Sequence, residues 1–143
     1  MKARAWFTLS LALVAPAAGA TELASLIDLP VAGSVRVPAS QYRNATPGGA
    51  RTDSPVDVAL SVTGELEGLR QLIVQANERA ESPSAARVTA IRDGLLDDAV
   101  RTERWDIAVV RTAAGPWEVR QVRKSWRCQR GAKAAGWTAR PCP

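Results

Sequence analysis

WDIAVVRTAAGPWEVRQVRKSW, residues 105–126, is the stretch of sequence that decides the fold. Apolar side chains alternate with polar or small ones from Trp105 to Val109, and this period of two predicts a strand with one buried face. Residues 113–116 contain Gly and Pro and supply a turn. Apolar residues resume directly after the turn, so the sequence predicts a β-hairpin.

The return strand of this hairpin changes its alternation partway along. Val119 and Val122 lie three residues apart, whereas residues on one face of a regular strand lie two apart. One extra residue would restore the alternation, so we expect a β-bulge near Arg120-Gln121.

The segment before the hairpin predicts three further elements. Residues 56–62 alternate valine or leucine with polar or small residues, which predicts a half-buried strand. Residues 66–79 place apolar side chains at steps of three and four, which predicts an amphipathic helix of about four turns. Residues 87–92 run into the turn dipeptide Asp93-Gly94 and favour a strand, although the apolar spacing over 84–103 also leaves a helix open.

Together these elements predict an α+β fold, an antiparallel sheet of about three to five strands with one main amphipathic helix packed on a face. Val31–Val37 adds a candidate edge strand that Pro38 ends, and residues 40–55 read as a loop rich in turn-forming residues. We divide the chain into a signal peptide at 1–20, an irregular segment and loop at 21–55, and an α+β domain with a disulfide-closed C-terminal loop at 56–143.

The first twenty residues have the pattern of a cleavable signal peptide. Lys2 and Arg4 precede an uncharged apolar run at 6–15, which is short for a membrane-spanning helix. Ala18-Gly19-Ala20 supplies the small residues that a signal peptidase needs, so cleavage would leave Thr21 as the N-terminus. We expect a periplasmic or secreted protein that is not an integral membrane protein after cleavage; the alternative is a retained membrane anchor.

Export bears on the two cysteines, Cys128 and Cys142. In an oxidising compartment such a pair favours a disulfide. It would close a loop of about 15 residues and contribute roughly 3 kcal/mol through the reduced entropy of the unfolded chain. Free or intermolecular thiols are the alternative.

Basic and aromatic residues concentrate at the C-terminal end. Residues 21–103 carry eight basic and twelve acidic side chains, whereas residues 104–143 carry nine basic and two acidic ones, a net charge of +7. Such a segment can bind a polyanion, or its arginines can simply solvate the exposed face of a sheet. Trp105, Trp117 and Trp126 fit core positions, while Trp137 has no apolar neighbours and is expected to be exposed. The candidate ligand-binding residues are Arg120, Arg123, Lys124, Arg127, Arg130 and Trp137.

The residue types present exclude several kinds of catalytic site. The chain contains no histidine, so it has no Ser–His or Cys–His pair for nucleophilic catalysis. A zinc site would need the cysteines, which we expect to be bonded to each other, and no cofactor or metal motif is found. Asp97 and Asp98 could serve as catalytic carboxylates, but we expect them to cap a turn and to pair with Arg101 or Arg104.

The C-terminal part resembles a group of small exported bacterial proteins. The resemblance rests on Asp93-Gly94-Leu95-Leu96-Asp97-Asp98, on Trp126-Arg127-Cys128 and on Cys142-Pro143, and it covers about residues 87–143. It implies export and a Cys128–Cys142 pairing, and it implies no activity.

These observations favour a non-catalytic binding module of the cell envelope over an enzyme. Its partner is an envelope or extracellular molecule, with an anionic polymer as the candidate. One alternative is a structural or assembly role in which the hairpin adds to another protein's sheet. A second alternative is a hydrolase that uses Asp97 or Asp98.

Overall fold

The computed structural model describes residues 23–38, 41, 53–64, 67–113, 115–131 and 136–143. The predicted signal peptide and most of the loop predicted at 40–55 lie outside these residues, so both stay predictions.

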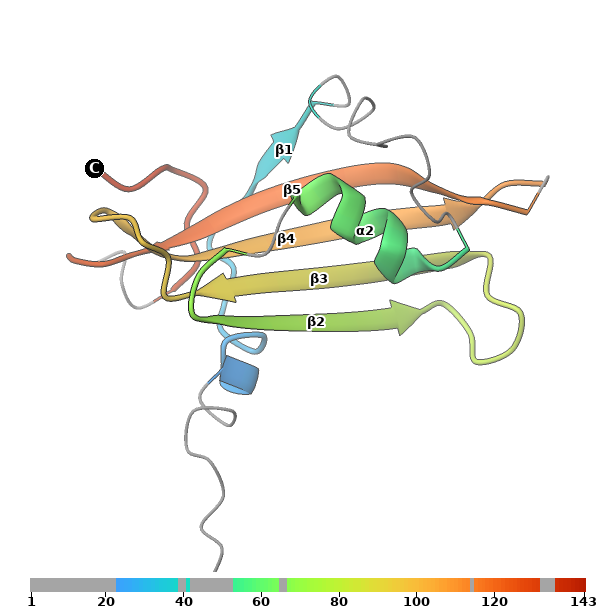
Figure 1. Cartoon of the computed structure of the whole chain (residues 1–143), viewed down its shortest axis with the longest axis horizontal. Helices are drawn as coiled ribbons and strands as arrows, with labels where there is room; N and C mark the ends of the chain where they lie inside the picture. Colours follow the sequence, from blue (N-terminus) through green and yellow to red (C-terminus); the bar gives the residue numbers. More distant parts are fainter. Residues whose placement is uncertain (1–22, 39–40, 42–52, 65–66, 114, 132–135) are drawn as a thin grey trace, which may run out of the picture.

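The described residues form one antiparallel sheet with a helix on one face (Figure 1). The elements follow the chain as β1 (Val35–Val37), α2 (Pro55–Thr63), β2 (Arg70–Asn77), β3 (Ala85–Asp93), β4 (Val100–Arg111) and β5 (Trp117–Cys128). The five strands lie in the order β1-β5-β4-β3-β2, so β2 to β5 form a meander and β1 adds to its far edge. The predicted α+β fold is confirmed.

The strand predicted at 56–62 is wrong, because these residues lie in helix α2. Signals at the helix ends outweigh the alternation of apolar residues. The Ser54 hydroxyl accepts a hydrogen bond from the backbone N–H of Asp57, Pro55 occupies the first turn, and Gly64 ends the helix with a φ of 74°. The acidic side chain of Asp57 also lies at the positive end of the helix dipole.

The helix predicted at 66–79 is also wrong, because β2 occupies most of this segment. Its residues pair in register with β3, from Arg70 opposite Asp93 to Asn77 opposite Ala86. Ile73 packs on the apolar core between the sheet and α2. Its neighbour Leu72 packs on a second apolar core, on the opposite face of the sheet. A strand with apolar residues on both faces no longer alternates apolar and polar residues. In β2 the resulting spacing of apolar residues resembles that of an amphipathic helix.

The remaining strand predictions are confirmed. Residues 87–92 lie in β3, which ends at Asp93, and Gly94 follows with a φ of 70°. The hairpin consists of β4 and β5. Ala108 pairs with Gln121 and Val109 pairs with Val119, so Arg120 is the extra residue of the expected bulge. The edge strand predicted at Val31–Val37 is shorter in the structure: β1 covers only Val35–Val37, and it pairs with β5.

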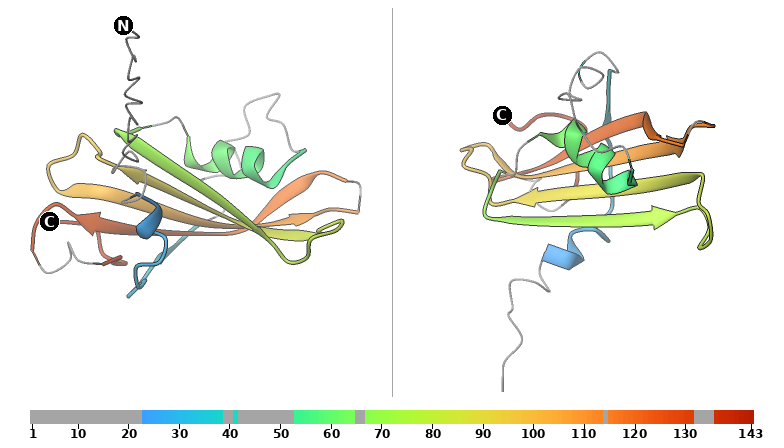
Figure 2. Two further views of the ribbon diagram at one scale, coloured as in Figure 1. Left: turned by 90° about the horizontal axis from the view of Figure 1, so that it is seen from below. Right: turned by 45° about the vertical axis from the view of Figure 1, so that its right-hand side comes forward.

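The sheet buries apolar side chains on both of its faces. On the helix face, Val58 and Ala59 of α2 pack against Val88, Ile107 and Val122 of the central strands. On the opposite face, here called the second face, the core consists of Leu23, Leu26, Ile91 and Trp137. Figure 2 shows the segment before β1, residues 23–34, and α2 on opposite sides of the sheet.

The Cys128–Cys142 disulfide is present, with a Cα–Cα distance of 5.4 Å. The expectation that Trp137 is exposed is wrong, because its side chain is only 1% exposed. The chain folds back beside β5, where the backbones of Trp126 and Thr138 exchange hydrogen bonds. Trp137 then enters the second core and donates from Nε1 to the backbone carbonyl of Leu26 at 3.1 Å.

Candidate functional site

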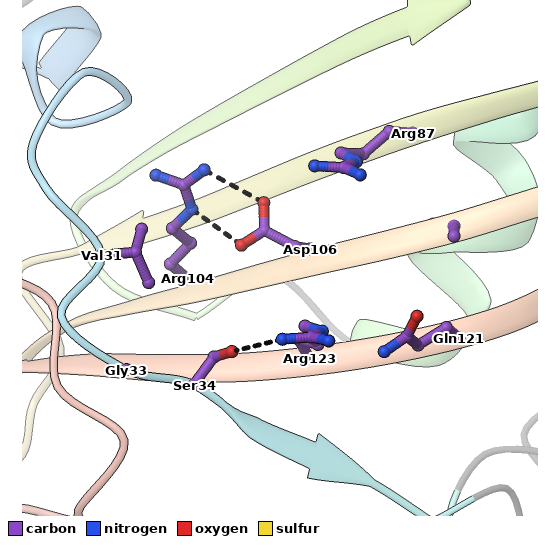
Figure 3. Close-up of a pocket in the computed structure, with 9 residues that line it drawn as sticks. Val31, Gly33, Ser34, Arg87, Arg104, Asp106, Gln121 and Arg123 are labelled. Atoms are coloured by element: carbon purple, nitrogen blue, oxygen red, sulfur yellow. Dashed lines mark hydrogen bonds and ion pairs between the residues drawn. The ribbon is translucent and has the colours of Figure 1, made fainter. Parts of the chain in front are cut away.

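Beside the second core, the second face holds an open, mostly polar groove of about 480 Å³ (Figure 3). Strands β3, β4 and β5 form its floor, and the segment around Ser34 forms one wall. Three guanidinium groups, one carboxylate, one amide and one hydroxyl line it; they belong to Arg87, Arg104, Arg123, Asp106, Gln121 and Ser34.

The register of the sheet brings these residues together. Residues directly opposite each other in neighbouring strands point to the same face. Arg87 lies opposite Ala108, which lies opposite Gln121, so the small alanine leaves space between two polar side chains. One step along the strands, Asp106 lies opposite Arg123.

Arg104 and Asp106 form a fixed pair at one end of the groove. They are two residues apart in β4 and so share a face, and Arg104 donates from Nε and Nη2 to the two carboxylate oxygens at 2.9 and 3.1 Å. Thr89 also donates to Asp106, at 2.8 Å, and Arg104 donates to the carbonyl of Ile27 at 3.0 Å. The Arg104 guanidinium lies 5.8 Å from the centre of the Trp137 ring. The second core therefore holds this pair in position, and the pair is close to electrically neutral.

Within the described residues, three other cations in or beside the groove, Arg87, Arg123 and Arg36, have no carboxylate partner. Arg123 donates to the hydroxyl of Ser34 at 3.5 Å, and the Gln121 amide, with its oxygen toward the guanidinium, accepts from Nε of Arg123 at 2.9 Å. Both partners are neutral. Arg87 and Arg36 are exposed, and within the described part of the chain neither has a hydrogen-bond or ion-pair partner.

Arg36 adds to this imbalance because it lies directly opposite Arg123 in the β1–β5 pair. Like charges at opposed positions on one face of a sheet destabilise it. With Arg36 included, the groove and its rim carry four guanidinium groups and one carboxylate. The resulting positive potential favours an anion between the strands.

The six predicted site residues do not form one surface. Arg123 and Arg127 lie on the second face, while Lys124 lies on the helix face, since neighbours in a strand point to opposite sides. Lys124 pairs with Glu103 and lies 4.4 Å from the centre of the Trp105 ring. Arg120 is exposed at the bulge and Arg130 is exposed beyond β5.

The prediction missed Arg87, Arg104 and Asp106. Each is one charged residue in an alternating strand and carries no local motif. Only the register of β3, β4 and β5 shows that they meet Arg123, and a single sequence does not reveal that register.

Asp97 caps a turn, as expected. Its Oδ1 accepts hydrogen bonds from the backbone N–H groups of Val100 and Ala99 at 2.7 and 2.8 Å, and these bonds lower the pKa of the Asp97 carboxyl. The expected arginine partners lie elsewhere: Arg104 pairs with Asp106, and Arg101 lies 3.9 Å from the carboxylate of Asp93. In the described ranges, no group of three or more Asp, Glu, Cys or His side chains is placed to hold a metal ion.

None of the described helices is long and apolar enough to span a membrane. Comparison with protein-family models, with curated proteins and with solved structures finds no match to this chain.

Proposed function

We propose that this chain is an exported, non-catalytic binding module, and that the groove on its second face binds an anionic ligand of the cell envelope. The observation that carries the proposal is the set of three arginines from three strands around one neutralised carboxylate. The predicted signal peptide, the resemblance to small exported proteins and the disulfide support the export part of the proposal.

The chemistry of the groove is suited to binding. Guanidinium groups present forked N–H donors that match carboxylate, sulfate and phosphate oxygens. Arg104 is already oriented by Asp106, so it loses little freedom when a ligand arrives. Arg87 and Arg123 supply the charge that a ligand would neutralise. Asp106 is held by Arg104 and Thr89, so it is not free to act as a base.

Binding of polyanionic probes to the disulfide-bonded protein tests this proposal. Fluorescence anisotropy would measure the affinity for a labelled heparin oligosaccharide and for labelled polyphosphate at several NaCl concentrations. The first probe carries sulfates and carboxylates and the second carries phosphates, so the two separate the anion types that one groove could accept.

Two double variants with equal net charge separate the groove from general basicity. Arg87→Gln with Arg123→Gln removes groove cations, whereas Arg120→Gln with Arg130→Gln removes exposed cations elsewhere on the protein. A hydrogen bond to a charged group contributes about 1.5–3 kcal/mol, so the groove pair, which removes two charged donors, should weaken binding by about 100-fold or more. It should also lower the slope of log K against log salt by about two.

The control pair should change the affinity only a few-fold, through long-range charge. Equal losses from both pairs would show that binding follows the overall charge and would contradict the proposed site. The absence of binding to either probe at low salt would contradict the proposed function itself.

A further inference from the structure

Among the described residues, the sheet has one long open edge, along β2. The opposite edge is occupied, because β1 and Thr138 both pair with the outer side of β5. Within the described residues, β2 pairs with β3 only. It is eight residues long and contains no proline, and its one charged side chain, Arg70, is held by Asp93. Edges of this kind bind further strands unless they are protected.

The backbone groups that face this edge follow from one hydrogen bond. Just beyond β2, the N–H of Glu78 donates to the carbonyl of Ala85 at 3.2 Å, in the register of the β2–β3 pair. Alternate residues of an antiparallel strand bond to opposite sides, so the even-numbered residues of β2 bond to β3. The odd-numbered residues, Gln71, Ile73, Gln75 and Asn77, therefore direct their N–H and C=O groups away from the sheet.

We propose that two copies of this chain pair through β2, antiparallel and about a two-fold axis at Val74, to form one continuous sheet. In this register Gln71 pairs with the partner's Asn77, and Ile73 pairs with the partner's Gln75. Every outward-directed backbone group of the strand then has a hydrogen-bond partner. A shift of the register by two residues in either direction leaves some of these groups at the ends unpaired.

The side chains match in the same register. Val74 meets its own copy on the axis, and Arg70 lies opposite the partner's Glu78, so opposite charges meet. Leu72 lies opposite the partner's Ala76. The segment from Leu23 packs beside Leu72 on the second face, and the incoming strand brings its smallest side chain to that crowded position.

This pairing has a consequence for binding, which rests on the proposed function. A two-fold axis perpendicular to a continuous sheet keeps both second faces on the same side. Strands lie about 4.8 Å apart, and five strand spacings separate the two copies of β4, so the two grooves would lie about 24 Å apart. One anionic polymer could then occupy both, and its avidity would exceed the affinity of a short fragment.

Sedimentation equilibrium of the ligand-free, disulfide-bonded protein tests the pairing directly, whatever the outcome of the binding assays. We expect a mass of two chains at high protein concentration. Val74→Lys puts two like charges on the axis and should return the mass to one chain. Leu96→Lys, which places the same charge at a fully exposed leucine between β3 and β4, should leave the dimer intact.

Oxidative cross-linking tests the register. Opposed residues that do not exchange hydrogen bonds lie about 4.5 Å apart at Cα, within the range of a disulfide. Val74→Cys should therefore give a covalent dimer under mild oxidation, whereas Leu96→Cys should not. A single-chain mass for the wild type at every concentration, a dimer that survives Val74→Lys, or cross-linking of Leu96→Cys alone would overturn the proposal.

Discussion

Replacement of Trp137 by alanine probes the link between the C-terminal loop and the groove. The indole is 1% exposed, and a buried tryptophan removes about 200 Å² from water. At about 25 cal/mol per Å² this burial contributes at most ~5 kcal/mol. The substitution also leaves the Leu26 carbonyl without its donor, at a cost of about 1 kcal/mol.

After allowing for the alanine methyl group and partial collapse of the cavity, we expect Trp137→Ala to lower the free energy of unfolding by about 4–5 kcal/mol. That is a large part of the 5–15 kcal/mol that is ordinary for a domain of this size. Urea denaturation followed by circular dichroism measures it, provided that the m-value is unchanged. Trp137→Phe keeps most of the apolar volume and should lose only about 1–2 kcal/mol.

A loss below about 0.5 kcal/mol for Trp137→Ala is what an exposed tryptophan would give, and it would refute the described packing. The same variant should weaken binding of anionic probes, because the indole supports the Arg104 guanidinium from 5.8 Å. Unchanged binding by a destabilised variant would show that the groove does not depend on the second core.

Three further predictions concern stability. Burial would raise the pKa of the Asp93 carboxyl, but hydrogen bonds from a threonine and an arginine, with two nearby positive charges, outweigh it and lower the pKa. Asp93→Asn should therefore cost about 2–3 kcal/mol at neutral pH, less than for a fully buried pair because Arg70 is partly exposed. Urea titrations should show this cost beginning to shrink as the pH falls below about 4, the ordinary pKa of an aspartate, and vanishing only below the lowered pKa of Asp93. Replacement of Cys128 and Cys142 by serine should lower the free energy of unfolding by about 3 kcal/mol. No loss would show that the disulfide does not stabilise the fold. Gly94→Ala should cost about 1–3 kcal/mol by thermal denaturation, since φ is +70° and the added Cβ would lie 3.0 Å from Leu69, whereas no shift in Tm would contradict the described turn.

The parts of the fold that the sequence predicts correctly are those that depend on residues close together in the chain. The hairpin follows from alternation on both sides of a Gly-Pro turn. The bulge at Arg120 follows from a change of alternation in a single strand. The disulfide follows from the number of cysteines and the expected compartment.

The exchange of helix and strand over 56–79 has two physical causes. Alternating valines at 56–62 carry less weight than a Ser54 cap followed by Pro55, which together begin a helix. In β2, Leu72 and Ile73 are both apolar because each faces a different core. The period of two assumes one buried face, and this sheet has two.

The groove was beyond prediction for a different reason. The sequence shows a basic segment at 104–143, and the structure divides that segment between two faces of the sheet. Arg123 of this segment lines the groove together with Arg87, which belongs to β3 and so lies outside the segment. Lys124, the next residue, points to the helix face. The sequence predicts an exposed Trp137 because no large apolar residue lies near it in the chain. Its contacts instead come from distant segments, including Leu26, more than 100 residues away, and Ile91.

The central claim, that the groove on the second face binds anions, is tested most directly by observing the arginine side chains. In a heparin oligosaccharide titration followed by ¹⁵N-edited NMR, the Nε–H resonances of Arg87 and Arg123 should shift with a common saturation curve. Those of Arg120 and Arg130 should shift little at the same concentrations. Shifts confined to Arg120 and Arg130, or equal for all four arginines, would contradict the claim.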